Sequence, residues 1–246
     1  MNFSFVLPTL CNKELLRKML ESFERTTKHK DKIEFLLAVD KGKLKSITNW
    51  LNKSDYSFDI YIYERKKTED FTNDYYNFLA NRCSGENVIA WNDDAWMRTK
   101  DWDEKILREI KSYGWSVYML DILDTARLKY KNTFPCFPCV SRRAMNTLGW
   151  LLHKDVPMYP ADKITTEVYS EVGRIIPIRN VLIEHEHIIE SDPSKSRMMD
   201  IFVKSQKKTP IININEDVIK LLKVASSEKN KKSSKFNRII NILKEK

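Results

Sequence analysis

The sequence is poor in glycine. It has only five glycines among 246 residues, and neither GxGxxG nor GxxxxGK[ST] occurs. Loops of these two patterns hold nucleotide phosphates through closely approaching backbone N–H groups. Their absence argues against a glycine-rich phosphate loop.

Cysteine is also scarce. The four cysteines, Cys11, Cys83, Cys136 and Cys139, are too few for a disulfide scaffold in a chain of this length. Cys136 and Cys139 form a CxxC, but no second CxxC or nearby histidine completes a zinc site. We therefore expect reduced, packed cysteines.

Long apolar runs are missing. No apolar stretch reaches 18 residues, and the N-terminal "MNFSFVLPTL" lacks the basic flank and long apolar centre of a signal peptide. We expect a cytoplasmic protein.

What is present is a globular composition with an unevenly placed charge. Hydrophobic residues make up 42% and aromatic residues 11% of the chain, which is typical of a globular protein. From residue 204 onward there are 12 Lys or Arg against 4 Asp or Glu, a charge of +8, whereas residues 1–203 hold 31 against 30, a charge of +1. We predict one domain over 1–203 and a basic tail over 204–246.

In the first half of the chain, predicted strands alternate with predicted helices. Apolar runs predict strands at 3–10, 32–42 and 87–91, and alternating apolar residues predict a strand at 58–65. Helical spacing predicts helices at 12–29 and 70–85, the latter stopped by Gly85. This alternation implies an α/β fold with parallel βαβ units and a crevice at the carboxyl ends of the strands. The 9–12 loop, Asp40 and the 92–94 cluster follow those ends, so they should converge.

The second half is less regular. Residues 115–123, 136–145 and 176–188 read as strands, and 161–173 as a helix capped by Asp162. The tail holds two amphipathic candidates, 215–226 capped by Asn215 and 234–246, whose apolar faces should pack on the domain.

The stretch "VIAWNDDAW" (88–96) places two adjacent carboxylates after a buried strand. Mg²⁺ and Mn²⁺ prefer oxygen ligands, and carboxylates supply them. On a strand, Asn92 and Asp94 would point one way and Asp93 the other, so one could bind metal and the other a sugar or a metal-bound water. A solvated turn or a helix cap is the alternative interpretation. Nearby, Trp91, Trp96 and Trp102 could stack on a sugar or base, or belong to the core.

The block "YYNFLANRCSGENVIAWNDD" resembles the "RN.G...A.GeyI..lDDD" stretch of glycosyltransferases of the GT-A fold, especially family two and related phage-encoded enzymes. "FVLPTL", "AVDKG" and "VSRRAMNTLGWL" are similar to further family segments in the same order, and "HEHIIESDPSKSRMMD" looks like the ending of phage members. The resemblance covers about residues 3–200. It implies a Rossmann-like nucleotide-diphospho-sugar transferase fold, a mixed sheet flanked by helices, here with a basic helical tail. It also raises a virus-encoded origin with expression in the host cytoplasm.

The resemblance carries site residues with it. It implies Mn²⁺ or Mg²⁺ on Asp94 of a DxD-like motif and on His185 or His187, and Asp162 as the catalytic base of an inverting transfer. The donor-binding residues that it implies are Pro8, Thr9, Asp40, Asn77, Asn92 and Asp93. Two positions depart from the family pattern, because Asn92 replaces the first aspartate and Tyr76 stands where many members have arginine.

The implied activity moves a sugar from a nucleotide-diphosphate donor, first of all a UDP-sugar, to an acceptor hydroxyl. The acceptor could be a glycan, a lipid-linked sugar or a hydroxymethylated base in DNA, and the basic tail could contact nucleic acid or an anionic membrane surface. Two other classes stay open: a nucleic-acid-binding protein, and a metal-dependent nuclease or nucleotidyltransferase that uses Asp93 and Asp94.

Overall fold

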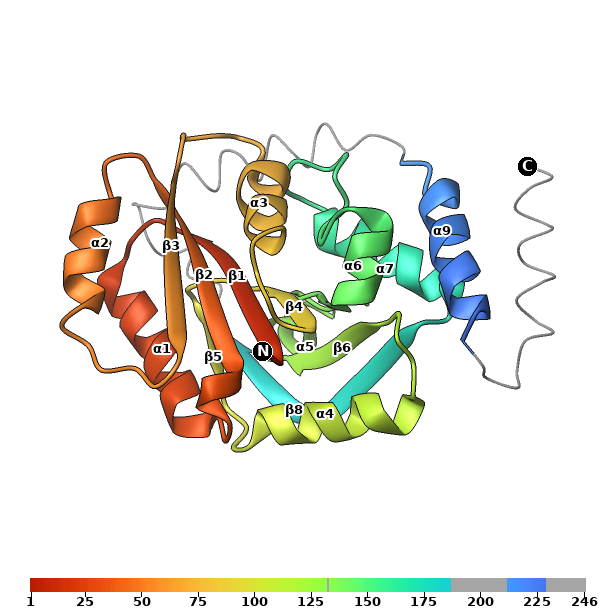
Figure 1. Cartoon of the computed structure of the whole chain (residues 1–246), viewed down its shortest axis with the longest axis horizontal. Helices are drawn as coiled ribbons and strands as arrows, with labels where there is room; N and C mark the ends of the chain where they lie inside the picture. The colour runs from red at the N-terminus through yellow and green to blue at the C-terminus, as the bar shows by residue number, and fades with distance from the viewer. Residues whose placement is uncertain (132, 187–211, 229–246) are drawn as a thin grey trace.

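The structure is a computed structural model that describes residues 1–131, 133–186 and 212–228. Its centre is an eight-stranded mixed sheet with helices on both faces (Figure 1). The strands, in the spatial order β3-β2-β1-β4-β7-β6-β8-β5, are β1 Phe3–Thr9, β2 Ile33–Asp40, β3 Asp59–Arg65, β4 Asn87–Ala90, β5 Ala95–Met97, β6 Met119–Asp124, β7 Cys139–Ser141 and β8 Ile175–His185. The helices are α1 Lys13–Thr26, the 3₁₀ turn η1 Lys30–Lys32, α2 Leu44–Leu51, the π-helical turn η2 Thr72–Asn77, α3 Phe78–Ala80, α4 Trp102–Tyr113, α5 Thr125–Tyr130, α6 Arg142–Leu148, α7 Ala161–Val172 and α9 Asn215–Ser226.

The first four strands are parallel, and β1, β2 and β4 are buried, as their apolar runs predicted. β3 is the edge strand of the sheet and alternates between exposed and half-buried residues. β1 pairs with β2 and β4, and β2 pairs with β3, all in parallel. Because side chains alternate along a strand, Phe5 packs with α1 and α4 on one face, whereas Val6 packs with α3, α6 and α7 on the other. One strand therefore supplies two separate apolar cores.

The second half brings more polar strand ends to the same edge of the sheet. β7 is antiparallel to both β4 and β6, so β6 runs parallel to β4, and β8 is parallel to β6. β5 is antiparallel to β8. The carboxyl ends of β1, β2, β4, β6 and β8 and the starts of β5 and β7 consequently share one edge, called here the carboxyl edge.

The predicted helix at 70–85 is a π-helical turn followed by a short α-helix that ends at Ala80. Gly85 therefore lies beyond the helix, and its prediction as the helix stop was wrong. A Cβ at Gly85 would lie 2.5 Å from the Ser4 Oγ and 2.7 Å from the Ser4 backbone N. Glycine is needed there because the chain passes directly over β1.

Two other local predictions need correction. The predicted strand 136–145 pairs over only three residues, because Ser141 caps α6, its Oγ accepting from the Ala144 N–H at 3.3 Å. Helix α7 has Pro160 at its N-cap, so Asp162 lies in the first turn and is not the cap. Likewise α9 has Ile214 at its N-cap and begins at Asn215.

The first predicted tail helix packs on the domain through its apolar face, as expected. Leu221 and Leu222 of α9 are fully buried against a core that includes α6 and α7. Near its start, Asp217 lies 3.3 Å from the Nε2 of His153, and just past its end Glu228 lies 3.4 Å from Arg174. The second predicted tail helix, 234–246, lies outside the described residues. Among the helices that are described, none combines the length and apolarity needed to cross a bilayer.

Candidate active site

Polar side chains converge at the carboxyl edge, as the parallel strand order predicted. Thr9 ends β1, Asp40 ends β2, Asp124 ends β6 and His185 ends β8. Residues 92–94 join β4 to β5 at the same edge. The sheet topology thus gathers residues from nearly the whole described chain.

The three residues Asn92, Asp93 and Asp94 occupy a turn. The Oδ1 of Asn92 accepts a hydrogen bond from the Tyr76 hydroxyl at 2.7 Å. The Oδ2 of Asp93 accepts from the Thr9 hydroxyl at 2.8 Å. The predicted strand-like alternation at 92–94 was wrong, because β4 ends at Ala90 and the chain reverses into β5.

Asp94 faces His185 at the end of β8. Its Oδ1 lies 3.4 Å from the Nε2 of His185, and both residues are buried, at 4% and 9% exposure. The backbone reinforces this pairing, since the Glu186 N–H donates to the Asp94 carbonyl at 3.1 Å. A carboxylate and an imidazole at this separation fit one divalent cation between them. His187, the other predicted ligand, lies outside the described residues.

The acids at this edge act on one another electrostatically. Burial and then the charges of Asp94, Asp93 and Asp162 raise the pKa of the Tyr76 hydroxyl. Burial raises the pKa of Asp162 to about 6; Asp124 raises it further and His185 lowers it. Asp162, in the first turn of α7, is therefore close enough to the ends of β6 and β8 to interact electrostatically with Asp124 and His185.

The loop after β1 is shaped by a backbone strain. Cys11 has a φ of 69°, in the left-handed region, and its N–H donates to the Thr9 Oγ1 at 2.9 Å. Asn12 then caps α1 by accepting from the N–H groups of Glu14 and Leu15. This arrangement places Thr9 and the preceding Pro8 at the carboxyl edge. Asp40 lies there too and accepts a hydrogen bond from the Tyr75 hydroxyl.

Asn77 does not serve the site as predicted. Its Oδ1 accepts from the N–H groups of Leu151 and Leu152, and its Nδ2 donates to the Leu152 carbonyl and to the Asn73 Oδ1. These four bonds use both donors and both acceptor positions of the amide. Asn77 ties the π-helical turn to the chain at 151–152 and has nothing left to offer a nucleotide.

Two residues at the site were missed by sequence reasoning, Asp124 and Cys136. The Asp124 carboxylate caps α5 by accepting from the Arg127 N–H at 2.7 Å, and it accepts from the Cys136 N–H at 3.4 Å. One ligand atom each from Asp124, Cys136 and His185 lie within 4.8 Å of one another. All four cysteines are free, as expected. Cys136 has no histidine near it in the sequence, but the fold brings His185 of β8 close to it.

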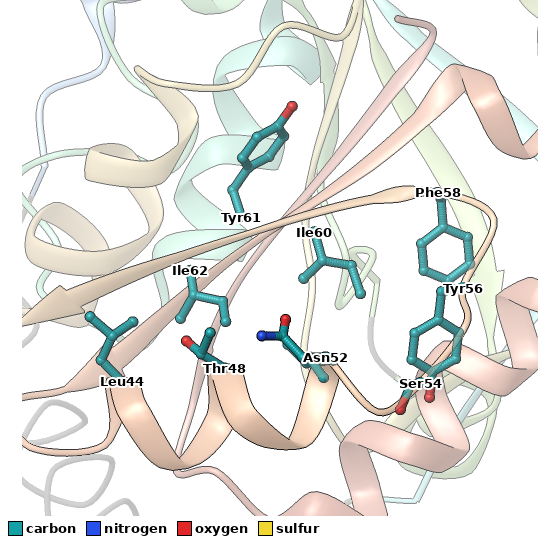
Figure 2. A pocket seen from close by; sticks show the side chains of 10 residues that line it. Leu44, Thr48, Asn52, Ser54, Tyr56, Phe58, Ile60, Tyr61 and Ile62 are labelled. Carbon is teal, nitrogen blue, oxygen red and sulfur yellow. The ribbon is translucent and has the colours of Figure 1, made fainter.

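The neighbouring tryptophans are core residues. Trp91 and Trp102 are fully buried and Trp96 is 6% exposed, so none of them offers a stacking surface. A separate groove lies between α2 and the edge strand β3, lined among others by Thr48, Tyr56, Ile60 and Ile62 (Figure 2). Among the described residues that line it none is charged, so these side chains would give a diphosphate no countercharge.

No protein-family model and no curated protein matches this sequence. Solved structures do match in fold. The chain is similar to S. aureus TarS 1-349 in complex with UDP-GlcNAc, with a TM-score of 0.60 and 12% identity over 99% of this chain and 71% of that one. It is also similar to the mannosyltransferase PcManGT from Pyrobaculum calidifontis in complex with GDP-Man and Mn²⁺, with a TM-score of 0.61 and 13% identity over 99% of this chain and 84% of that one. In a longer TarS structure the chain spans only 52% of the length. The eight-stranded mixed sheet flanked by helices is that of these GT-A glycosyltransferases, so the fold predicted from the sequence is confirmed.

Proposed function

We propose that this chain is a metal-dependent glycosyltransferase that moves a sugar from a nucleotide-diphosphate donor to an acceptor hydroxyl. The observation that carries the proposal is the buried Asp94–His185 pair, 3.4 Å apart, at the carboxyl edge of a GT-A sheet. In open α/β sheets, ligands bind in the crevice at this edge. The fold neighbours named above, one with UDP-GlcNAc and one with GDP-Man and Mn²⁺, support the choice of donor class.

The proposed metal ligands are Asp94 and His185, with His187 as a further candidate. A bound Mn²⁺ or Mg²⁺ would act as a Lewis acid that neutralises the charge developing on the departing diphosphate. Thr9 orients Asp93 through its 2.8 Å hydrogen bond, and Tyr76 orients Asn92 through its 2.7 Å hydrogen bond. These side chains, with Pro8 and Asp40, form the proposed donor-binding wall.

The proposed catalytic base is Asp162. A base must take the proton of the acceptor hydroxyl while the sugar–phosphate bond breaks, and this is easiest when its pKa lies near the working pH. Burial brings the pKa of Asp162 to about 6, well above the ordinary value for an aspartate. A base acting opposite the leaving group gives inversion at the sugar carbon.

The donor proposed first is a UDP-sugar, with a GDP-sugar as the alternative that PcManGT suggests. For the acceptor we keep a glycan, a lipid-linked sugar and a hydroxymethylated DNA base. The first and last can be presented in solution, whereas the second requires a membrane.

The test is release of nucleotide from a panel of UDP- and GDP-sugars with Mn²⁺, with and without candidate acceptors that include hydroxymethylated DNA. We expect slow hydrolysis of one donor, stimulated by the right acceptor. Asp94→Ala should abolish donor binding measured by calorimetry, whereas Asp162→Asn should impair transfer more than donor binding.

Asp55→Ala is the matched control, because Asp55 is an exposed aspartate remote in sequence from every proposed ligand. It should leave binding and transfer unchanged. Full transfer activity in both Asp94→Ala and Asp162→Asn would refute the site, and DNA cleavage without donor consumption would favour a nuclease.

A further inference from the structure

We propose that Cys136 is a metal ligand, and that Asp124, Cys136 and His185 form a thiolate-containing position that binds Zn²⁺ or a similar soft divalent ion. This deepens the proposed function by naming the class of cation for the same edge of the sheet. It rests on that function only for the use made of the ion, since the ligand set stands by itself.

The geometry of the three ligands supports the assignment. Their ligand atoms lie within 4.8 Å of one another. In a four-coordinate zinc site with bond lengths of about 2.0–2.3 Å, ligand atoms lie roughly 3.3–3.8 Å apart. Small side-chain rotations that move the ligand atoms by about 1 Å would therefore complete the site. Asp124 is fully buried, His185 is 9% exposed and Cys136 is half-buried, so the position is dry on the protein side and reachable on one side.

The backbone holds these ligands independently of any ion. Asp124 is fixed by the Arg127 N–H at 2.7 Å, and the Cys136 N–H donates to the same carboxylate. The Phe137 ring lies 4.8 Å from the His185 ring, centroid to centroid, and limits how that imidazole can turn. Ligands held in this way lose little conformational freedom when an ion binds.

The chemistry of the donor set separates it from an ordinary magnesium or manganese site. Mg²⁺ and Mn²⁺ prefer oxygen ligands, whereas a thiolate combined with imidazole and carboxylate suits Zn²⁺ and Co²⁺. The Asp94 Oδ1, 3.4 Å from the His185 Nε2, offers the same imidazole an oxygen-containing partner. We infer that His185 is shared between a hard-ion arrangement with Asp94 and a soft-ion arrangement with Cys136.

A second half-buried cysteine near the same edge provides a matched comparison. Cys11 follows Thr9 at the end of β1, and burial raises the pKa of its thiol to about 11, so it stays protonated near neutral pH. It lies outside the group of three ligands. A thiol in the neighbourhood is therefore not enough, and only Cys136 should behave as a ligand.

Affinity alone does not test this idea, because most nitrogen- and oxygen-containing sites bind Zn²⁺ more tightly than Mn²⁺. The full chain is stripped with EDTA, dialysed and titrated with Co²⁺, and its absorption spectrum is recorded. We expect a thiolate-to-cobalt charge-transfer band in the near ultraviolet and intense visible bands of a four-coordinate ion, both removed by one equivalent of Zn²⁺. Zn²⁺ should also protect Cys136 from iodoacetamide, with the modified site read by peptide mass spectrometry.

Three variants decide the outcome. Cys136→Ser should lose the charge-transfer band and weaken Zn²⁺ binding at least tenfold, Asp124→Asn should weaken it while keeping the band, and Cys11→Ser should change neither. A band that persists in Cys136→Ser, or a wild-type spectrum without any band, overturns the proposal. If no nucleotide sugar is consumed but the band behaves as expected, the proposed function fails and the metal site stands.

Discussion

The two ends of the parallel strands each hold a buried acidic group, and the two environments are opposite in character. Near the start of β2, the Oε1 of Glu34 accepts from the hydroxyl of Ser4, from the N–H and hydroxyl of Ser84 and from the N–H of Gly85. At the carboxyl edge, four acids, Asp93, Asp94, Asp124 and Asp162, act electrostatically on one another or on the same tyrosine.

The difference shows how a buried acid reveals its role. Glu34 is surrounded by donors and compensated by the protein itself, so it holds β1, β2 and the turn before β4 together. At the carboxyl edge, the charge of Asp124 adds to burial in raising the pKa of Asp162, and a bound cation would offset that repulsion. Glu34 is therefore a structural acid, whereas the acids of the carboxyl edge are the better candidates to bind a cation.

The largest expected effect belongs to the structural acid. Glu34→Ala would remove the charged acceptor of the buried Ser4 hydroxyl and of the N–H and hydroxyl of Ser84, at a cost of about 3–4 kcal/mol in the free energy of unfolding. The Gly85 N–H would keep only its other acceptor, the Ser4 Oγ at 2.7 Å. Urea denaturation measures this. Glu34→Gln is the control, because it keeps one accepting oxygen and should cost much less. Equal losses in the two variants would mean that packing, and not the acceptor, matters at this position.

Adding a cation should stabilise the other end of the strands. With Mn²⁺ at about 100 times its dissociation constant, the free energy of unfolding should rise by about 2.7 kcal/mol, and EDTA should reverse the gain. Thermal denaturation with and without Mn²⁺ measures it. Glu34→Gln should keep the gain and Asp94→Asn should lose it. The same gain in Asp94→Asn would place the ion elsewhere.

The ionised Asp162 side chain should lower the free energy of unfolding at high pH. Its folded-state pKa of about 6 lies above the ordinary 3.8, so the folded protein binds the proton more tightly than the unfolded chain between these values. The contribution of Asp162 to stability is therefore complete below pH 3.8 and is lost as the pH rises through 6. In EDTA, Asp162→Asn should gain about 2 kcal/mol over wild type at pH 8 and almost nothing at pH 4. A pH-independent difference, measured by urea denaturation at both pH values, would contradict this assignment.

The smallest effect concerns the support of the turn at 92–94. Thr9→Val removes the hydroxyl that donates to Asp93 and accepts from the Cys11 N–H, which should cost about 1 kcal/mol in the free energy of unfolding. It should also weaken Mn²⁺ binding, measured by calorimetry, less than Asp94→Asn does. Thr26→Val, which removes a hydroxyl bonded only within α1, should leave Mn²⁺ affinity unchanged.

Sequence patterns predicted the parallel strands and the residues at their carboxyl ends. The segments 3–10, 32–42 and 87–91 are strands because each has an apolar run bounded by polar residues, and 58–65 is a strand because its apolar residues alternate with polar ones. The convergence of Thr9, Asp40 and residues 92–94 follows from parallel pairing. The segment 70–85 failed because the side chain of Asn77 fixes it to the distant chain at 151–152. Tertiary contacts of that kind leave no local pattern.

Asp124 and Cys136 could not be recognised for a related reason. Both become site residues only because β7 and β6 pair antiparallel and β8 joins β6 in parallel. A CxxC with no neighbouring histidine predicts nothing by itself, whereas in the folded sheet Cys136 lies beside a histidine from the last strand. The spacing of residues along the sequence predicts individual helices and strands well, but it does not predict the order of the strands in the sheet.

The position of His185 at the end of β8 sets an order of events during synthesis on the ribosome. Asp94 is translated early and its imidazole neighbour emerges about ninety residues later, after every other described strand. A nascent or truncated chain that lacks β8 therefore has no complete cation-binding corner, so ion loading has to follow sheet closure.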